Sequence, residues 1–409
     1  MGSQELLRCF WQFLRESEMK RRDILKKVVL FAGAVILLTG CGEAKKAYDK
    51  GMELAKAGKY EKSLPHFKEA IKENGEQAEY YIGYGMALCR LNRFEAAKEE
   101  FQKVIQETDN KISKENNKQL CYGMAIAEYG LGEYDSVIEY CDKAVEIEYL
   151  DDMDCDILYT KVSALWQQGE WKKAEETCNS LLEKNRNYMD AYMALAGIEQ
   201  ELGESDRAVQ AYKDAIETDK TYYEAYFKLY QQYWSVGQTD AANELLDQLV
   251  ALKPNKAENM MVIGRAYFYK QEYDRAKEYL KMANDGNNKE SLYYSGMVSA
   301  ALGEYEDAIS YYQKYIKENK EALNVEVYYH LALVYMQQEE YDKAQSMITK
   351  GISYGVTAAL QELKKTQVIL LEKQNCYEEA VPLAEDYIKC YPADTAMEKE
   401  LSFIKTRIK

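Results

Sequence analysis

Gly-Glu-Trp-Lys-Lys-Ala at residues 169–174 and Gly-Glu-Tyr-Glu-Asp-Ala at residues 303–308 are two copies of one short phrase that this chain repeats ten times. The third residue of the phrase is usually aromatic, and this aromatic column reads Tyr60, Phe94, Tyr134, Trp171, Ser205, Thr239, Tyr273, Tyr305, Tyr341 and Tyr377. The sixth residue is usually alanine, and this alanine column reads Ser63, Ala97, Val137, Ala174, Ala208, Ala242, Ala276, Ala308, Ala344 and Ala380. The copies follow one another at a nearly constant interval, as the numbers of either column show. A regular interval of this length indicates that one structural unit is copied along the chain.

The residues around each phrase predict a pair of helices joined by a tight turn. The first residue of the phrase is usually one that accepts left-handed backbone geometry, and such residues commonly end helices; it reads Gly58, Asn92, Gly132, Gly169, Gly203, Gly237, Gln271, Gly303, Glu339 and Asn375. Apolar residues on either side recur at spacings of three and four, as in Phe67, Ala70 and Ile71, which is helical periodicity. We therefore predict helical hairpins that cross closely at the alanine column, where small side chains permit a short distance between helix axes.

This pattern resembles the tetratricopeptide repeat (TPR), a family whose repeat has a similar length and whose signature combines a glycine, an aromatic residue, an alanine and a late proline. The resemblance covers residues 44–394, with Pro254 and Pro392 at expected inter-repeat turns. It implies an all-α fold, a right-handed superhelical α-solenoid of about ten hairpins. Extra residues near Asn110–Asn117 and Leu150–Met153 are expected to lengthen loops without interrupting the stack.

A stack of hairpins needs a cap at each end, because its terminal apolar faces have no neighbouring repeat. In residues 395–409, Met397, Leu401, Ile404 and Ile408 place one apolar stripe on a helix whose other face is charged. This segment is expected to form a capping helix over the last repeat.

Residues 19–40 have the order of a secretory signal peptide. Met19-Lys20-Arg21-Arg22, with Lys26 and Lys27, is followed by the apolar stretch Val28–Leu38 and then by Thr39-Gly40-Cys41. An apolar stretch of about 11 residues is shorter than the about 20 that cross a bilayer. Cleavage is therefore expected rather than a permanent transmembrane helix, and residues 1–18 are a possible upstream mis-start that leaves Met1 or Met19 as the first residue.

Leu38-Thr39-Gly40-Cys41 resembles a bacterial lipobox. The resemblance implies that the Cys41 thiol receives a diacylglyceryl group and that residues 41–43 become the lipidated N-terminus of the mature protein. A two-chain lipid is sufficient for stable membrane attachment. The alternative is an uncleaved membrane-anchoring helix in which the cysteine is incidental.

The charge of the chain argues against nucleic acid as a partner. The full sequence has 53 basic and 69 acidic side chains, a formal net charge of −16, and loss of the first 40 residues would make it about −19. Phosphate backbones bind basic surfaces, and anionic lipid headgroups likewise repel an acidic body. The membrane contact is therefore expected to pass through the lipid on Cys41.

Residues for catalysis, cofactor binding or metal binding are not apparent in the sequence. His66 and His330 are its two histidines and are separated by seven repeats, and Gly-rich phosphate loops, nucleophile elbows and Cys-x-x-Cys pairs are absent. Of nine cysteines, Cys9 lies upstream and Cys41 is assigned to lipid, while Cys141 and Cys178 share the column of Phe67 and are expected in the core. Whether any of the seven remaining thiols pair is left open.

In TPR proteins the first helix of each hairpin lines the concave surface, and positions twelve, eight and five before the aromatic column share one face of that helix. Aromatic residues and methionines dominate these positions and suit an adaptable groove for apolar segments. The candidate groove residues are Tyr122, Tyr129, Tyr159, Trp166, Met193, Phe227, Trp234, Met261, Phe268, Tyr293, Met297, Tyr329 and Met336. The alternative is that these side chains pack between repeats.

One turn earlier on the same helices lies an acidic column, which reads Glu79, Asp156, Asp190, Glu224, Glu258, Glu290, Glu326 and Glu362. Acidic residues favour helix N-termini because of the helix dipole, which is the simpler explanation. A groove edged with carboxylates is nevertheless expected to prefer a neutral or basic partner.

Together these features predict a membrane-tethered lipoprotein that binds another protein or peptide segment on the outer side of the bacterial cytoplasmic membrane, as scaffold, assembly factor or docking platform. A cytoplasmic or uncleaved, signal-anchored TPR scaffold is the alternative, and an enzyme accessory subunit is a remote one. The partner's identity, the pathway, the envelope layer and the oligomeric state do not follow from the sequence.

Overall fold

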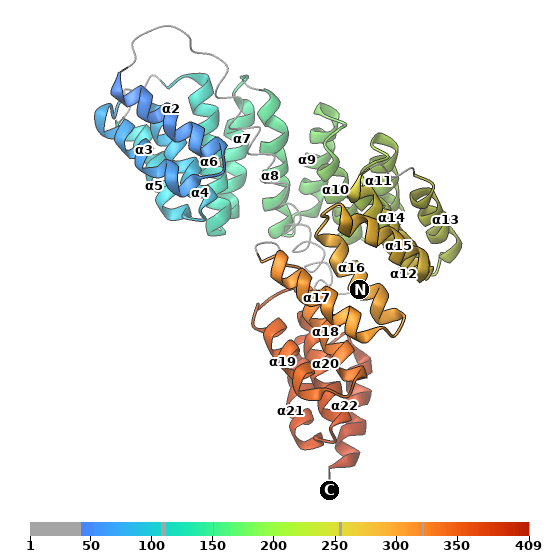
Figure 1. The fold of residues 1–409 in the computed structure, drawn as a ribbon. Helices are drawn as coiled ribbons and strands as arrows, with labels where there is room; N and C mark the ends of the chain where they lie inside the picture. The colour runs from blue at the N-terminus through green and yellow to red at the C-terminus, as the bar shows by residue number, and fades with distance from the viewer. Residues whose placement is uncertain (1–41, 108–111, 150, 253–255, 321–322, 409) are drawn as a thin grey trace. The chain divides into compact units, whose positions relative to one another are not determined.

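The computed structural model describes residues 42–408 except 108–111, 150, 253–255 and 321–322. The expectations for residues 1–41, including Cys41, and for Pro254 therefore lie outside the described residues. Within them, Figure 1 shows an all-helical chain. The helices are α2 (Glu43–Lys56), α3 (Tyr60–Glu73), α4 (Ala78–Arg90), α5 (Phe94–Glu107), α6 (Lys114–Leu131), α7 (Tyr134–Glu146), η1 (Asp151–Met153), α8 (Asp154–Gln167), α9 (Trp171–Lys184), α10 (Met189–Glu201), α11 (Ser205–Thr218), α12 (Tyr223–Ser235), α13 (Thr239–Val250), α14 (Ala257–Tyr269), α15 (Tyr273–Asp285), α16 (Glu290–Ala301), α17 (Tyr305–Glu318), α18 (Glu326–Gln337), α19 (Tyr341–Ile352), α20 (Leu360–Lys373), α21 (Tyr377–Cys390) and α22 (Thr395–Arg407).

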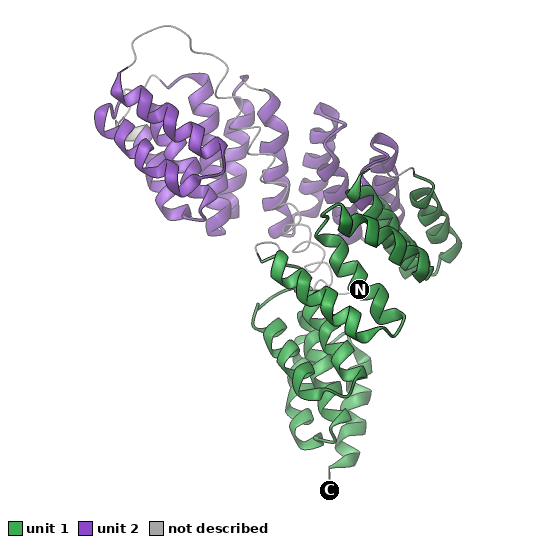
Figure 2. Cartoon of the chain, viewed as in Figure 1, with its two compact units in different colours: residues 1–19, 226–409 green, residues 20–225 purple. Residues whose placement is uncertain are grey.

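These helices follow one another as ten hairpins and a final helix. The even-numbered helices α2 to α20 are the first helices of the hairpins, and α3 to α21 are the second helices. Most helices pack on the next in sequence, and successive first helices such as α4 and α6 or α14 and α16 also pack on one another. The described residues fall into two compact units, 42–225 and 226–409, coloured separately in Figure 2. The predicted all-α solenoid of TPR hairpins is confirmed.

The turn inside every hairpin has the same geometry. Each of the ten aromatic-column positions is the first residue of a second helix. The residue two positions earlier has a positive φ in all ten hairpins, between 56° and 83°, including Gln271 and Glu339. The residue after it donates its N–H to the carbonyl five positions back, at 2.8–3.0 Å in every hairpin. This hydrogen bond is that of a Schellman motif, which satisfies carbonyls left over at a helix C-terminus.

The alanine column marks the closest packing in each hairpin, since all ten of its side chains have no exposed surface. Next to this crossing, a residue of the first helix faces a residue of the second helix, and the two differ in size. Gly85 lies against Phe101, and a Cβ at Gly85 would be 2.5 Å from the phenylalanine ring. In the α8–α9 hairpin the corresponding positions hold Val162 and the smaller Cys178, both buried. In these two hairpins a smaller residue in one position therefore accompanies a larger one in the other, as close packing requires.

The extra residues between the second and third hairpins extend a helix, so the expectation of a longer loop is wrong for residues 114–117. The Ser113 hydroxyl accepts the Asn116 N–H at 3.1 Å and begins α6 there. Lys118, which has no exposed surface, lies one turn later with its Nζ 2.6 Å from an Asp154 carboxylate oxygen. This buried ion pair joins the lengthened α6 to the start of α8. In the second insertion, residues 151–153 form the short helix η1 instead of an irregular loop.

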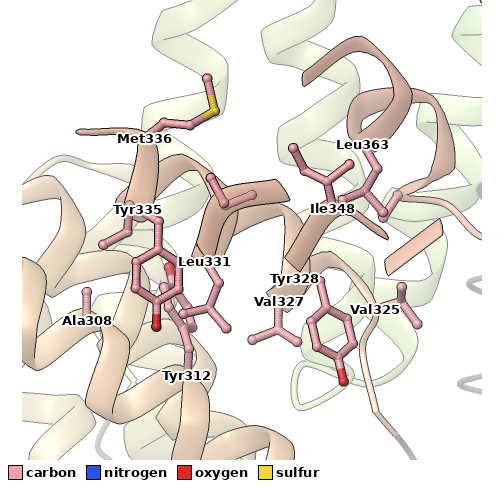
Figure 3. Close-up of a cluster of buried hydrophobic side chains, with 14 of the residues drawn as sticks. Ala308, Tyr312, Val325, Val327, Tyr328, Leu331, Tyr335, Met336, Ile348 and Leu363 are labelled. Atoms are coloured by element: carbon pink, nitrogen blue, oxygen red, sulfur yellow. The ribbon is translucent and has the colours of Figure 1, made fainter. Parts of the chain in front are cut away.

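The core of the unit 226–409 is rich in tyrosine. Side chains of α17, α18, α19 and α20 meet in one cluster around Leu331, shown in Figure 3. Tyr312 and Tyr315 in this cluster have no exposed surface. Their hydroxyls require hydrogen-bond partners, because an unpaired buried polar group is costly.

The final helix α22 covers the last hairpin as predicted. Its Met397 and Ile404 are buried in a cluster with Ala384 and Tyr387 of α21. The Asp394 side chain caps α22 by accepting the Ala396 N–H at 3.1 Å. The same carboxylate accepts the Tyr387 hydroxyl at 2.7 Å, which fastens the cap to the preceding helix.

Replacement of a buried alanine-column residue by a larger one is expected to weaken the fold. Ala174→Leu adds three carbons where the side chain has no exposed surface, and overpacking of this kind costs about 1–3 kcal/mol. Lys172→Leu on the same helix is the control, since Lys172 is exposed. Urea unfolding followed by circular dichroism should give a lower midpoint for Ala174→Leu than for Lys172→Leu, and equal midpoints would contradict the assignment.

A carboxyl pair near the cap makes stability depend on pH. Partial burial and the adjacent Glu400 carboxyl raise the pKa of Glu372 from 4.5 to about 7. Between these values the folded protein holds a proton that the unfolded chain releases, so Glu372 lowers stability as pH rises from about 4.5 to about 7. Glu372→Gln should therefore raise the melting temperature at pH 8 and leave it nearly unchanged at pH 4.5. Glu183→Gln, in the exposed last turn of α9, is the control. An equal shift at both pH values in Glu372→Gln would argue against the pair.

Candidate partner-binding surface

The thirteen candidate groove residues lie on first helices, and their exposure divides them into three groups. Five are buried, namely Tyr122, Met193, Phe227, Tyr293 and Met336. Seven are partly exposed, namely Tyr129, Tyr159, Trp166, Met261, Phe268, Met297 and Tyr329. Trp234 is 49% exposed. The buried five fit the alternative of packing between helices, while the other eight have surface that a partner could contact.

Several partly exposed residues are held by their own hairpin. The residue five positions before the aromatic column packs edge-on or tilted against the column ring wherever both are aromatic. The ring centroids of Tyr129 and Tyr134 are 5.6 Å apart, those of Trp166 and Trp171 are 5.4 Å apart, and those of Phe268 and Tyr273 are 5.9 Å apart. The ring pair at the ends of α6, α8 and α14 limits how far these side chains can move toward a partner.

Trp166 also contacts the next hairpin. A Cβ on Gly197 of α10 would lie 2.5 Å from a Trp166 ring atom, so glycine is needed at this position for the indole to fit. Gly197 lies eight positions before the column residue Ser205, on the helix face predicted for the groove, and the structure brings it against Trp166. One face of Trp166 therefore stabilises the contact between hairpins, and its remaining surface is what a partner could reach.

The acidic column has a role that the sequence did not reveal. The Tyr188 hydroxyl donates to Asp156 at 3.0 Å, and the Tyr222 hydroxyl donates to Asp190 at 3.0 Å. Each tyrosine belongs to the hairpin after that of its carboxylate. Burial and the nearby Asp156 carboxylate raise the pKa of Tyr188, which keeps this hydroxyl protonated. These carboxylates thus connect successive hairpins, and the signal in the sequence is that both pairs have the same separation along the chain.

Similar bonds occur in the unit 226–409 with other tyrosines. The Tyr293 hydroxyl donates to Glu326 at 3.2 Å, and the Tyr315 hydroxyl donates to Glu290 at 3.5 Å. The hydroxyls of these buried tyrosines therefore have partners.

An aromatic ladder on α12 and α14 was only partly identified from the sequence. We use this name for Trp234, Tyr230, Tyr269 and Phe227, whose neighbouring ring centroids are 5.8, 5.1 and 5.9 Å apart in that order. Tyr230 and Tyr269 were not among the candidates. The available signal was Tyr230 itself, because the other nine hairpins have Gly, Ala or Val at that position. The Arg265 guanidinium carbon lies 3.7 Å from the centroid of the Phe227 ring.

The two histidines, which catalysis or metal binding would commonly use, lie far apart in the chain, and each has side-chain neighbours. His330 lies among Tyr293, Tyr312 and Tyr329, with centroid distances of 5.6, 6.1 and 5.1 Å, and its burial lowers its pKa. His66 is 3.9 Å from a Glu69 carboxylate oxygen. Across the ranges that the structure describes, groups of three or more His, Cys, Asp or Glu side chains suited to a metal ion are absent.

A polar cavity of about 540 Å³ lies between α7, α8 and α9. Its charged side chains engage one another, since Lys161 lies 2.5 Å from Asp142 and the Gln168 amide donates to Asp135 at 2.7 Å. These two contacts join α7 of one hairpin to α8 and its C-cap residue Gln168 in the next.

The seven cysteines of the described residues are all free thiols. Cys141 and Cys178 have no exposed surface, as the core assignment predicts, and burial raises the pKa of each thiol. Burial likewise raises the pKa of Cys89 to about 12. Such thiols are unreactive at neutral pH, because the thiolate is the reactive form.

Comparison with known proteins agrees with the repeat architecture. Family models described as tetratricopeptide repeat match residues 48–111, 159–222 and 299–365. A model described as anaphase-promoting complex, cyclosome, subunit 3 matches residues 235–315. No curated protein matches the chain.

Several solved structures are similar at low sequence identity. A tetratricopeptide repeat protein from Parabacteroides merdae is 14% identical, with 63% of this chain and 98% of that chain covered and a TM-score of 0.41. The APC/C hetero-tetramer Cut9–Hcn1 is 13% identical, with coverage of 88% and 76% and a TM-score of 0.45. YrrB, a TPR protein with an unusual peptide-binding site, is 17% identical, with coverage of 44% and 88% and a TM-score of 0.36. On its matched repeats and its helical hairpins, this chain is a protein built of tetratricopeptide repeats.

Proposed function

We propose that this chain is a membrane-tethered TPR lipoprotein that binds another protein on the outer side of the bacterial cytoplasmic membrane. The TPR scaffold is suited to protein–protein interaction, and the proposal concerns where and how it does so. The observation that carries it is the set of eight partly exposed aromatic and methionine side chains on first helices. Side chains of these types dominate the energetics of protein interfaces.

The membrane part of the proposal is supported by sequence. The basic run, the short apolar stretch and Leu38-Thr39-Gly40-Cys41 occur in the order of a lipoprotein signal. In the portion of the chain that the structure describes, every helix is too short or too polar to span a bilayer. A net charge of −16 disfavours direct adsorption to anionic headgroups, so a lipid on Cys41 is the proposed tether.

A role in binding rather than catalysis agrees with the site. The carboxylates of the acidic column that we describe accept tyrosine hydroxyls, and the buried thiols have raised pKa values. A scaffold, an assembly factor and a docking platform each need a surface that binds a partner, and none of these roles needs reacting groups.

The partner surface is tested by Trp234→Ala. Removal of this exposed indole should weaken capture of crosslinked partners from cells, because aromatic side chains of this kind dominate the energetics of interfaces. Capture is measured by crosslinking and mass spectrometry, with helical content checked by circular dichroism. Trp166→Ala tests the second indole but also removes its contact with Gly197, so it is interpreted only if its helical content is retained.

Phe403→Ala on α22 is the matched control, since Phe403 is 43% exposed and lies outside the first helices. It should leave capture unchanged. Unchanged capture in Trp234→Ala, with normal helical content, would discard the first-helix surface as the partner site.

The lipid tether is tested by Cys41→Ser. Cells supplied with a labelled fatty acid should label the wild-type protein and leave the variant unlabelled, because the serine hydroxyl does not replace the thiol as acceptor. The variant should also leave the membrane fraction. Cys155→Ser, which keeps Cys41, should behave as wild type; absence of label on the wild-type chain would refute the lipoprotein assignment.

A further inference from the structure

We propose that the aromatic ladder of α12 and α14 binds an arginine or lysine side chain from a basic segment of the partner protein, with Trp234 as the anchor. The inference rests on the proposed function and names the chemistry of the partner at that surface. Four observations carry it: the exposed indole, the reason for its exposure, the intramolecular cation already on the ladder, and the charge of the chain.

Trp234 is exposed because its hairpin lacks the ring that covers the equivalent residue elsewhere. In the hairpins that begin with α6, α8 and α14, an aromatic residue five positions before the column packs on the column ring. The α12–α13 hairpin has Thr239 at the column position. It is the one hairpin of the ten that combines an aromatic residue five positions earlier with a column residue lacking a ring. The missing ring leaves 49% of Trp234 exposed.

The inner end of the ladder already binds a cation. The Arg265 guanidinium lies 3.7 Å from the centroid of Phe227 and 5.7 Å from that of Tyr269. Both distances are within the range of a cation–π interaction. Tyr230 and Phe227 are buried, with 6% and 1% of their surfaces exposed, so the chain itself covers these two rings of the ladder. The ladder thus shows within one molecule the contact that we assign to its open end.

The open end offers a stronger ring for a cation. Tryptophan has the most favourable face for a cation among the aromatic residues. Within the described residues, the ring contact of Trp234 is with Tyr230, stacked at an interplanar angle of 25°. Val236, two residues later in the chain, is an apolar residue that is 58% exposed. The methylene groups of a lysine or arginine side chain bury well along an apolar surface while the charged end approaches the ring.

The charge of the chain favours a basic partner over an acidic one. The net charge is −16, so its field attracts basic segments and repels phosphorylated or acidic ones. Arg265 is already committed to Phe227.

The test uses the full chain and a fluorescent twelve-residue peptide of alternating arginine and glycine, with binding measured by fluorescence anisotropy. Trp234→Leu keeps an apolar side chain but removes the ring, and it should weaken binding by about threefold to thirtyfold. Phe403→Leu is the matched control, because Phe403 is similarly exposed and its ring is already 4.8 Å from the Arg407 guanidinium. It should bind as wild type does, which separates the ladder from general attraction to an acidic protein.

A peptide of alternating glutamine and glycine should not bind measurably, and a proline-rich peptide or a neutral oligosaccharide should bind more weakly than the arginine peptide. Equal affinity of Trp234→Leu and wild type for the arginine peptide would overturn the proposal. Tighter, Trp234-dependent binding of a neutral probe would also overturn it. If Trp234→Ala weakens partner capture while the arginine peptide fails to compete with that partner, the proposed function stands and the basic-partner inference falls.

Discussion

The close crossing of two helices at the alanine column is the constraint on which the rest of this structure depends. Ten side chains in the first turn of the second helices have no exposed surface, so the two helices of each hairpin meet where little side-chain volume separates them. A tight turn with a left-handed residue and a Schellman hydrogen bond is the connection that brings the helices together there. The glycine opposite Phe101 and the valine of the hairpin that has Cys178 are adjustments of volume around the same crossing.

Stacking of the hairpins then decides which first-helix side chains remain accessible. Tyr122, Met193, Phe227, Tyr293 and Met336 share the face predicted for a groove but are buried. Trp166 contributes one face to its contact with Gly197. The tyrosine hydroxyls that reach carboxylates of neighbouring hairpins add polar links to this packing. The surface available to a partner is therefore what remains after the contacts between hairpins are made.

Much of the fold could be predicted from the sequence because it is local and repeated. Glycine or asparagine two residues before an aromatic, with alanine three residues after it, locates the turn and the first residue of each second helix. Burial of a particular first-helix residue depends on side chains of the next hairpin, which spacing alone does not reveal. The Tyr188–Asp156 bond was not predicted for that reason. Residues 114–117 of the first insertion form the start of α6 because Ser113 supplies a cap.

Departures from the repeat indicate function better than the repeat itself. Positions that obey the pattern are explained by packing, since each hairpin needs the same turn and the same close crossing. The α12–α13 hairpin departs twice, with Tyr230 where the others have Gly, Ala or Val and with Thr239 where most have a ring. These changes have opposite effects on packing, since one adds a ring beside Trp234 and the other removes the ring that would cover it. A stacked pair with one exposed indole is a costly arrangement to leave in water, because apolar surface is stabilised by burial. On the proposed partner assignment, contact with the partner buries this indole, and the two departures together become favourable.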